Sequence, residues 1–224
     1  MTPPLIRQLT ADPVIAVVRA PAIADAAELC AALAEGGIGC TELTFTTPDV
    51  TAHLARAADA GHRVGAGTVL TADQAHAAVD AGASFLVTPG LRAEVAEVAH
   101  RRGVPVVMGA LTPTEVAQAV DLGAAAVKIF PARAFGPAYL KDLHGPFPGV
   151  PLVASGGVNA ANAAAFLSSG AIAVCAGSDV VPPLSVSTSA WPDLTTRARA
   201  FVHALRPASE GRQPAPAPSA EGPR

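Results

Sequence analysis

VPVVMGALTPTEVAQAVDLGAAAVKIFP, residues 104–131, shows most directly how this chain folds. The apolar run 104–108 predicts a strand, and Thr112-Pro-Thr-Glu115 is typical of a capping box that opens a helix. That helix should end at Gly123, because glycine readily adopts the backbone angles found just after a helix. The second apolar run, 124–130, predicts another strand. This part of the chain is therefore a strand–helix–strand unit.

The same alternation recurs on both sides of this unit. Apolar runs predict strands at 13–19, 39–45, 63–66, 84–88, 104–108, 124–130, 150–154 and 172–176. Helices are predicted at 23–35, 48–60, 73–81, 92–102, 112–123, 137–143, 159–169 and 192–205. Eight such units favour an α/β fold of the (β/α)₈ TIM-barrel type over an open doubly wound sheet. Gly65-Ala-Gly67 lacks the third glycine of a dinucleotide-binding fingerprint.

The chain is predicted to form one domain, residues 1–206. A tail at 207–224, rich in Pro, Ala, Ser and Gly, is predicted to be disordered. Hydrophobic residues make up 50% of the chain and charged residues 15%, which fits a sheet buried on both faces.

The net charge of −3 gives no basic surface for nucleic acid. No secretory signal is evident at the N-terminus. Residues 143–178 contain no Asp, Glu, Lys or Arg, but their glycines and prolines argue against a membrane span. Three widely spaced cysteines favour a reducing compartment, so we expect a cytoplasmic protein. Each cysteine is expected to pack as a small hydrophobic residue.

Lys128 is the first candidate functional residue. Lys128 and Lys141 are the only lysines, whereas the chain has thirteen arginines. Lys128 also lies within an apolar strand, where desolvation disfavours the charged form of an amine. An amine can lose its proton and attack a carbonyl, whereas a guanidinium cannot. The alternative is that the ammonium pairs with a carboxylate or extends out of the strand end.

Glu42 is the second candidate, because it lies inside a predicted strand where an unpaired carboxylate is costly. In a barrel, Glu42 and Lys128 should both project inward near the carboxyl ends of the strands. A lysine nucleophile beside a glutamate can support Schiff-base chemistry, with the carboxylate moving protons. A buried structural ion pair is the alternative.

Two glycine-containing segments, Gly156-Gly157 and Gly177-Ser178, follow the last two strands. Glycines there let backbone N–H groups approach an anion, and these loops often hold phosphate in this fold. A side chain at Gly157 or Gly177 should fill the space of the phosphate or require a backbone angle it cannot reach. The glycines could instead only turn the chain. Arg19, which ends the first strand, could bind a phosphate or carboxylate, or form a salt bridge at the rim.

Six motifs, in order, closely resemble the 2-keto-3-deoxy-6-phosphogluconate / 4-hydroxy-2-oxoglutarate aldolase family. They are Thr41-Glu-Leu-Thr44, Gly65-Ala-Gly-Thr-Val-Leu70, Thr88-Pro-Gly90, Val127-Lys-Ile-Phe-Pro131, Leu140-Lys-Asp-Leu-His-Gly-Pro-Phe-Pro148 and Ser155-Gly-Gly157. The resemblance implies a (β/α)₈ barrel, a homotrimer, and a class I aldolase that uses no metal and no cofactor. It also implies a small phosphorylated keto acid as substrate.

The resemblance also implies a role for each matching residue. Lys128 would form the Schiff base with the C2 ketone, and Glu42 would be the general acid/base. Thr68 would contact the pyruvate carboxylate. Other substrate contacts carried over by position are Gly156, Gly157, Gly177 and Ser178 for the phosphate, and Pro89 and Phe130 for the pocket wall. The implied reaction cleaves 2-keto-3-deoxy-6-phosphogluconate to pyruvate and glyceraldehyde 3-phosphate, with 4-hydroxy-2-oxoglutarate as a further substrate.

Two features differ from the gluconate-type pattern. Thr46 stands where many of those members have arginine, and Arg19 together with Ala134-Phe-Gly-Pro137 resembles the branch that acts on 2-keto-3-deoxy-6-phosphogalactonate.

Two other functions remain open from the residues. One is a phosphosugar isomerase or epimerase on the same barrel, and the other is a sugar-phosphate binding protein without catalysis. No pair of histidines has metal-ligand spacing, so no metal site is expected.

Overall fold

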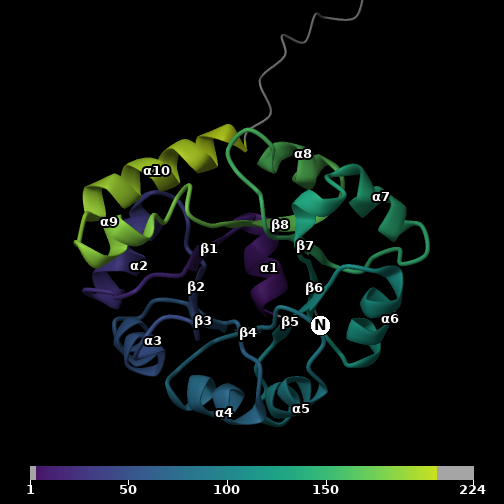
Figure 1. The fold of residues 1–224 in the computed structure, drawn as a ribbon, viewed down its shortest axis with the longest axis horizontal. Coiled ribbons are helices and arrows are strands. Elements are labelled where there is room, and N and C mark those ends of the chain that lie inside the picture. The colour runs from purple at the N-terminus through teal and green to yellow at the C-terminus, as the bar shows by residue number, and fades with distance from the viewer. Residues whose placement is uncertain (1–3, 206–224) are drawn as a thin grey trace, which may run out of the picture.

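A computed structural model of the protein, which describes residues 4–205, contains eight parallel strands that close into a barrel (Figure 1). The strands are β1 (Val14–Val18), β2 (Thr41–Thr44), β3 (Val64–Gly67), β4 (Leu86–Val87), β5 (Val106–Ala110), β6 (Ala126–Ile129), β7 (Leu152–Ala154) and β8 (Ala171–Ala176). Each strand pairs with the next in sequence, and β8 pairs with β1. The predicted (β/α)₈ barrel is confirmed. The tail at 207–224 lies outside the described residues.

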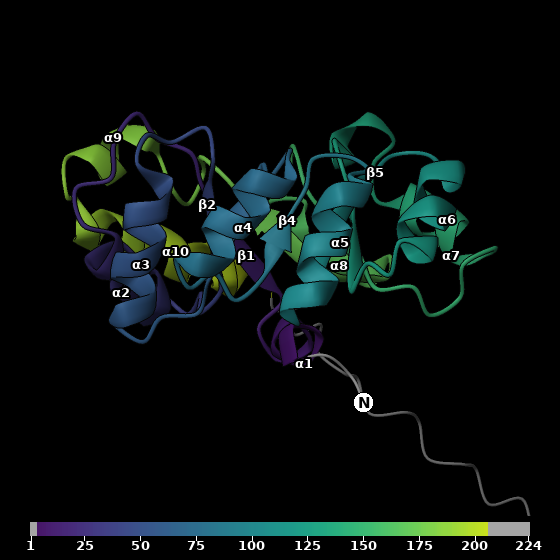
Figure 2. The same ribbon diagram turned by 90° about the horizontal axis from the view of Figure 1, so that it is seen from below.

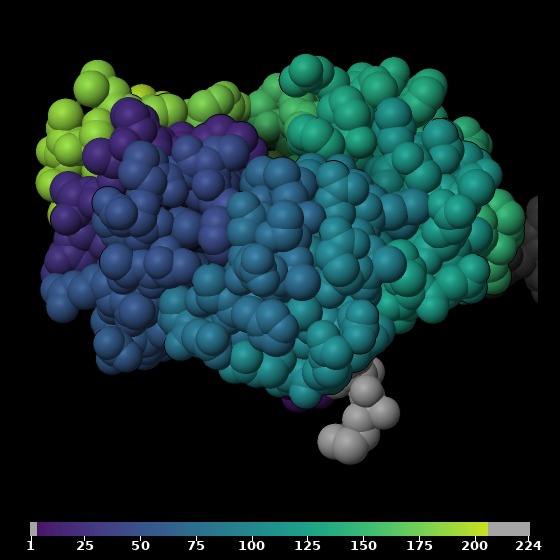
Figure 3. Space-filling model, turned by 60° about the horizontal axis from the view of Figure 1, so that its bottom comes forward, coloured from purple at the N-terminus to yellow at the C-terminus, as the bar shows by residue number. Residues whose placement is uncertain are grey.

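The helices pack around the outside of the barrel and, in the case of the first helix, across one of its ends. They are α1 (Pro4–Ala11), α2 (Ala26–Glu35), α3 (Val50–Asp59), α4 (Ala72–Asp80), α5 (Ala93–Arg102), α6 (Pro113–Asp121), the 3₁₀ helix η1 (Ala132–Ala134), α7 (Ala138–His144), α8 (Ala163–Ser168), α9 (Pro183–Ser187) and α10 (Trp191–Ala204). The predicted capping box at the start of α6 is present, with Thr112 and Glu115 bonded to each other's backbone N–H. In the space-filling view, the blue and teal helices from α3 to α6 form a continuous outer surface (Figure 3).

Some predicted boundaries are wrong. Helix α8 begins at Ala163 and not at Asn159, because the side chains of Asn159 and Asn162 accept backbone N–H groups and hold a turn there. Strand pairing in β4 is limited to Leu86 and Val87 within the predicted run 84–88. Helices α1 and α9 are not among the elements predicted from the sequence.

Helix α1 closes the amino-terminal end of the barrel. It appears at the centre of the ring in Figure 1 and below the barrel in Figure 2. Its buried residues Leu5, Ile6 and Leu9 pack with inward-facing strand residues in a second hydrophobic core, among them Phe85 and Val107. The interior is therefore sealed at this end, which leaves the carboxyl ends of the strands as the open end.

Two glycines of β3 make room for large inward-facing side chains of neighbouring strands. A Cβ atom at Gly65 would overlap the ring of Phe85, and one at Gly67 would overlap the carboxyl group of Glu42. Strand interiors ordinarily disfavour glycine, which often marks a close approach by another group. Gly67 therefore creates the space in which the Glu42 carboxylate lies.

Of the helices between residues 4 and 205, none combines the length and apolar character needed to cross a bilayer.

Candidate active site

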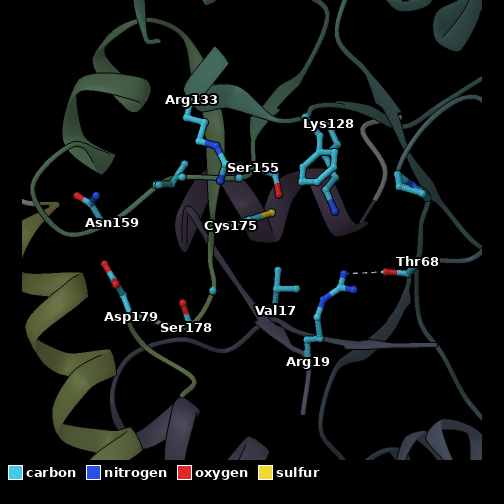
Figure 4. A pocket seen from close by; sticks show the side chains of 16 residues that line it. Val17, Arg19, Thr68, Lys128, Arg133, Ser155, Asn159, Cys175, Ser178 and Asp179 are labelled. Atoms are coloured by element: carbon cyan, nitrogen blue, oxygen red, sulfur yellow. Dashed lines mark hydrogen bonds between the residues drawn. The ribbon is translucent and has the colours of Figure 1, made fainter. Parts of the chain in front are cut away.

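A cavity of about 650 Å³ lies at the carboxyl ends of the strands (Figure 4). It is lined by every predicted site residue except Glu42, namely Arg19, Thr68, Pro89, Lys128, Phe130, Gly156, Gly157, Gly177 and Ser178. The remaining lining residues are Val17, Arg133, Ser155, Val158, Asn159, Cys175 and Asp179. Thr46 is not part of this lining.

Lys128 and Glu42 come together beside this cavity. The Lys128 Nζ atom lies 3.8 Å from Glu42 Oε1, and the two side chains are 8% and 1% exposed. Neither carboxyl oxygen of Glu42 has a hydrogen-bond partner among residues 4–205. A buried pair that serves stability alone needs close geometry and further hydrogen bonds to offset the cost of desolvation. The separation and the unpartnered oxygens favour a reactive pair over a structural ion pair.

Arg19 and Thr68 form one side of the cavity. Arg19 Nη2 donates a hydrogen bond of 3.3 Å to Thr68 Oγ1, drawn as the dashed line in Figure 4. Thr68 has a φ of 56°, a left-handed backbone angle that is rare for a β-branched residue. Such strain is concentrated at functional sites, where the surrounding structure maintains it. This side therefore presents a positive charge and a fixed hydroxyl group.

The loop after β7 presents backbone N–H groups. The carbonyl oxygens of residues 155–157 accept hydrogen bonds from Ala132 N at 2.7 Å, Arg133 N at 3.0 Å and Asn162 Nδ2 at 2.9 Å. Within residues 4–205, the N–H groups of residues 156–158 make no hydrogen bond. Buried or half-buried N–H groups normally find a partner. These donors are therefore available to an anion in the cavity.

The loop after β8 is arranged similarly. The Gly177 carbonyl accepts hydrogen bonds from Val180 N at 3.0 Å and Val181 N at 2.9 Å. In the described part of the chain, the N–H groups of Ser178 and Asp179 are not hydrogen-bonded. Donors at the start of such a turn attract anions. Figure 4 shows Ser178 and Asp179 across the cavity from the Arg133 side chain.

Of the two reasons given for glycine at these positions, the backbone angle applies to Gly157 and not to Gly177. Gly157 has a φ of 81°, and a Cβ there would meet the Arg133 side chain at 2.6 Å. Gly177 does not adopt a left-handed angle, and a Cβ there would have no other atom within 4 Å. For Gly177, the remaining reason is that a side chain would occupy space that the ligand needs. Gly177 lines the cavity, so a side chain there would extend into it.

Comparison with known proteins agrees with this geometry. Residues 5–196 match the family model described as KDPG and KHG aldolase. The chain belongs to this family.

Two relatives and one solved structure illustrate the similarity. The chain is 37% identical to a 2-dehydro-3-deoxy-phosphogluconate aldolase of Treponema pallidum, over 81% of this chain and 88% of the relative. It is 34% identical to the 2-dehydro-3-deoxy-6-phosphogalactonate aldolase of Escherichia coli, over 88% and 96% of the two chains. A KDPG aldolase structure from Legionella pneumophila, with pyruvate captured as a covalent carbinolamine, has a TM-score of 0.81 and 31% identity, over 90% and 99%. The protein is an aldolase, a carbon–carbon lyase.

Cys175 also lines the cavity, although it is not among the site residues predicted from the sequence. Burial raises the pKa of its thiol to about 11, although nearby Lys128 and a hydrogen bond with Ser155 oppose the shift. Cys175 therefore remains a neutral thiol near neutral pH and is a poor nucleophile there. All three cysteines are buried and free, as expected, but Cys175 also contributes to the cavity wall.

Ser155 and Cys175 could have been found from the sequence by counting in steps of two along β7 and β8. Inward positions alternate along a strand, so both residues share the inward face with Gly157 and Gly177. Arg133 follows β6 in η1, where no such period applies. Its position required the tertiary structure.

Proposed function

We propose that the aldolase is a class I enzyme that cleaves 2-keto-3-deoxy-6-phosphogluconate to pyruvate and glyceraldehyde 3-phosphate. One observation carries this proposal. The Lys128–Glu42 pair, 3.8 Å apart, lies beside a cavity with Arg19 and Thr68 on one side and the glycine loops on the other. This arrangement suits an extended substrate that has a carboxylate at one end, a ketone next to it and a phosphate at the far end.

The first half of the proposed reaction forms the imine. The Lys128 ammonium first gives a proton to Glu42, and the resulting amine attacks the C2 carbonyl. Further proton transfers through Glu42 convert the carbinolamine to a protonated imine with loss of water. The buried site removes water from both reacting groups. Arg19 and Thr68 hold the substrate carboxylate so that C2 faces Lys128.

The second half breaks the C3–C4 bond. The Glu42 carboxylate takes the proton from the C4 hydroxyl, the C3–C4 electron pair moves into the iminium, and glyceraldehyde 3-phosphate departs. The remaining enamine takes a proton at C3, and hydrolysis of the imine releases pyruvate and restores Lys128. Glu42 lies close enough to Lys128 to serve each of these proton transfers.

A second candidate substrate is the C4 epimer, 2-keto-3-deoxy-6-phosphogalactonate. Arg19, which resembles the galactonate branch, lines the cavity, while Thr46 does not. Thr46 instead bonds Thr44, with 2.9 Å between their hydroxyl oxygens. The similar Escherichia coli protein carries the galactonate name. 4-Hydroxy-2-oxoglutarate, cleaved to pyruvate and glyoxylate, is proposed as a further substrate.

Pyruvate release, coupled to lactate dehydrogenase and NADH, tests the proposal on both epimers and on 4-hydroxy-2-oxoglutarate. Saturable release from at least one phosphorylated epimer supports it, and the ratio of kcat/KM values identifies the preferred epimer. Conversion of a phosphosugar without pyruvate would favour an isomerase or epimerase. Binding without turnover would favour a sugar-phosphate binding protein.

Activity should persist after dialysis against EDTA. No three His, Cys, Asp or Glu side chains within residues 4–205 are grouped as a metal site, and the protonated imine already serves as the electron sink. The measurement compares pyruvate release before and after chelation. Loss of activity that a divalent cation restores would contradict the Schiff-base assignment.

The Gly177→Val substitution should raise KM sharply for the phosphorylated substrate and change kcat/KM for 4-hydroxy-2-oxoglutarate much less. Valine meets no protein atom near Cβ and requires no left-handed angle, so the protein should fold. Its side chain instead occupies cavity space next to the Ser178 N–H. The measurement is the ratio of the two kcat/KM changes. Equal losses on both substrates would show that Gly177 serves the barrel and not the phosphate.

The proposed assembly is a homotrimer, as the family resemblance implies. The proposed location is the cytoplasm, because the three widely spaced cysteines favour a reducing compartment. Phe135 is 60% exposed, and its ring centroid lies 4.7 Å from that of Tyr139. Exposed aromatic residues are enriched where protein surfaces meet. Light scattering coupled to size-exclusion chromatography distinguishes a trimer from a monomer.

A further inference from the structure

Arg133 lies next to the glycine loop after β7. It belongs to η1, and its backbone N–H donates a 3.0 Å hydrogen bond to the Gly156 carbonyl. The preceding residue, Ala132, donates a 2.7 Å bond to the Ser155 carbonyl. These two bonds fix the backbone of η1 to the loop. The position of Arg133 relative to the free N–H groups of the loop is therefore set by the fold.

The aliphatic part of the Arg133 side chain lies over Gly157. A Cβ at Gly157 would meet Arg133 Cβ at 2.6 Å, Cδ at 2.9 Å and Cγ at 3.1 Å. Because Gly157 has no side chain, the arginine stem can lie flat against the loop. Figure 4 shows that the stem carries the guanidinium group toward the interior of the cavity, on the same side as Asn159. Long basic side chains commonly use their stems in this way.

The guanidinium group has no partner that would otherwise account for its position. Among residues 4–205, it makes no ion pair or hydrogen bond. The other two basic residues of the cavity, Arg19 and Lys128, lie on the opposite side in Figure 4. On the loop side, the only other charged residue is Asp179, whose carboxylate repels an anion. Arg133 offsets this charge where the anion would lie.

We propose that Arg133 binds the terminal phosphate of the substrate and sets the preference for phosphorylated over unphosphorylated keto acids. The backbone N–H groups of the two loops orient the phosphate, and the guanidinium group adds a positive charge and up to two parallel hydrogen bonds to it. For the substrate preference, this inference rests on the proposed aldolase function. For phosphate binding itself, it rests only on the geometry of the loop.

The Arg133→Met substitution tests the charge, because methionine keeps an unbranched apolar stem over Gly157 and loses the guanidinium group. We expect kcat/KM for the phosphorylated substrate to fall by about 10–100-fold, the range for a hydrogen bond to a charged group, mainly through KM. The value for 4-hydroxy-2-oxoglutarate should change less than about twofold, because that substrate has no phosphate. Arg133→Lys should recover part of the loss, since it keeps the charge without the planar fork.

Arg101→Met is the matched control, because Arg101 pairs with Glu97 on the exposed face of α5 and does not line the cavity. It should leave both kcat/KM values unchanged. Equal losses on both substrates in Arg133→Met would overturn the proposal in favour of a packing role over Gly157. If Arg133→Met keeps the wild-type preference for the phosphorylated substrate over 4-hydroxy-2-oxoglutarate, the proposal is also overturned.

Inorganic phosphate binding, measured by calorimetry, separates this inference from the proposed function. The wild-type protein should bind phosphate, and Arg133→Met should bind it at least tenfold more weakly, with weaker binding at high salt. This result can be obtained even if no tested substrate releases pyruvate, in which case the catalytic assignment fails and the anion site stands. Equal affinity in both proteins, or no binding to the wild type, would overturn the role of Arg133.

Discussion

Incubation with pyruvate and sodium borohydride should inactivate the aldolase and place a covalent adduct on Lys128. Pyruvate presents the same ketone as the substrate, and borohydride reduces the imine to a stable secondary amine. Lys128 lines the cavity and lies beside Glu42, whereas Lys141 is exposed on α7 and does not line the cavity. Digestion and mass spectrometry should therefore find the modified peptide at Lys128 and unmodified Lys141. An adduct on Lys141 alone, or no adduct, would contradict the imine mechanism.

The Lys128→Met substitution should abolish both pyruvate release and borohydride trapping. Its folding needs a separate control, because the change leaves the Glu42 carboxylate buried without its cation, a situation that commonly costs about 3–5 kcal/mol. The double variant Lys128→Met/Glu42→Gln removes both charges and should unfold at a temperature closer to that of the wild type. If the double variant is folded and inactive, the loss of pyruvate release comes from the missing catalytic groups and not from unfolding. Turnover in either variant would exclude Lys128 as the nucleophile.

Glu42→Gln should keep the fold and lower turnover by about 10²–10⁴-fold, the range for a positioned general acid/base. Glutamine has nearly the same shape, so it fits the space that Gly67 leaves, but it cannot take or return a proton. Trapping by borohydride should be slowed as well, because the carboxylate is proposed to transfer protons during imine formation. Steady-state kinetics and the rate of pyruvate-dependent inactivation are the two measurements.

Glu97→Gln is the control for this change, since Glu97 lies on the exposed face of α5 and pairs with Arg101. It should have wild-type turnover. Near wild-type turnover in Glu42→Gln would return Glu42 to the role of a structural partner for Lys128. A loss of turnover with unchanged trapping would confine Glu42 to the steps after imine formation.

Much of the fold was predictable because each strand–helix unit carries its own signals. The capping box at Thr112 and Glu115 and the apolar run that holds Lys128 were recognised from neighbouring residues alone. The boundaries were less predictable. The turn at Asn159 depends on side-chain hydrogen bonds that compete with helix formation. Helix α1 was missed because its role is to close the end of a barrel built from all the strands.

The candidate site was predicted where its residues end strands, since the carboxyl ends of parallel strands meet at one end of a barrel. Lys128 and Glu42 are predicted from residue type, as an amine and a carboxylate within apolar strands, and the barrel predicts that both project inward near this end. Arg133 was not predicted, because it extends from η1 across a neighbouring loop. The residues next to Arg133 in the sequence do not indicate that its side chain extends over Gly157 toward the cavity.

The sequence by itself determined the strand–helix alternation, the inward face of each strand and the presence of an amine and a carboxylate on that face. These properties depend on local periodicity and residue type. Only the tertiary structure decided that Glu42 and Lys128 lie 3.8 Å apart, that neither carboxyl oxygen of Glu42 is hydrogen-bonded within residues 4–205, and that Thr68 adopts a left-handed angle. The physical reason is that barrel closure and strand register, together with the space left at Gly67 and Gly157, fix contacts between elements distant in sequence.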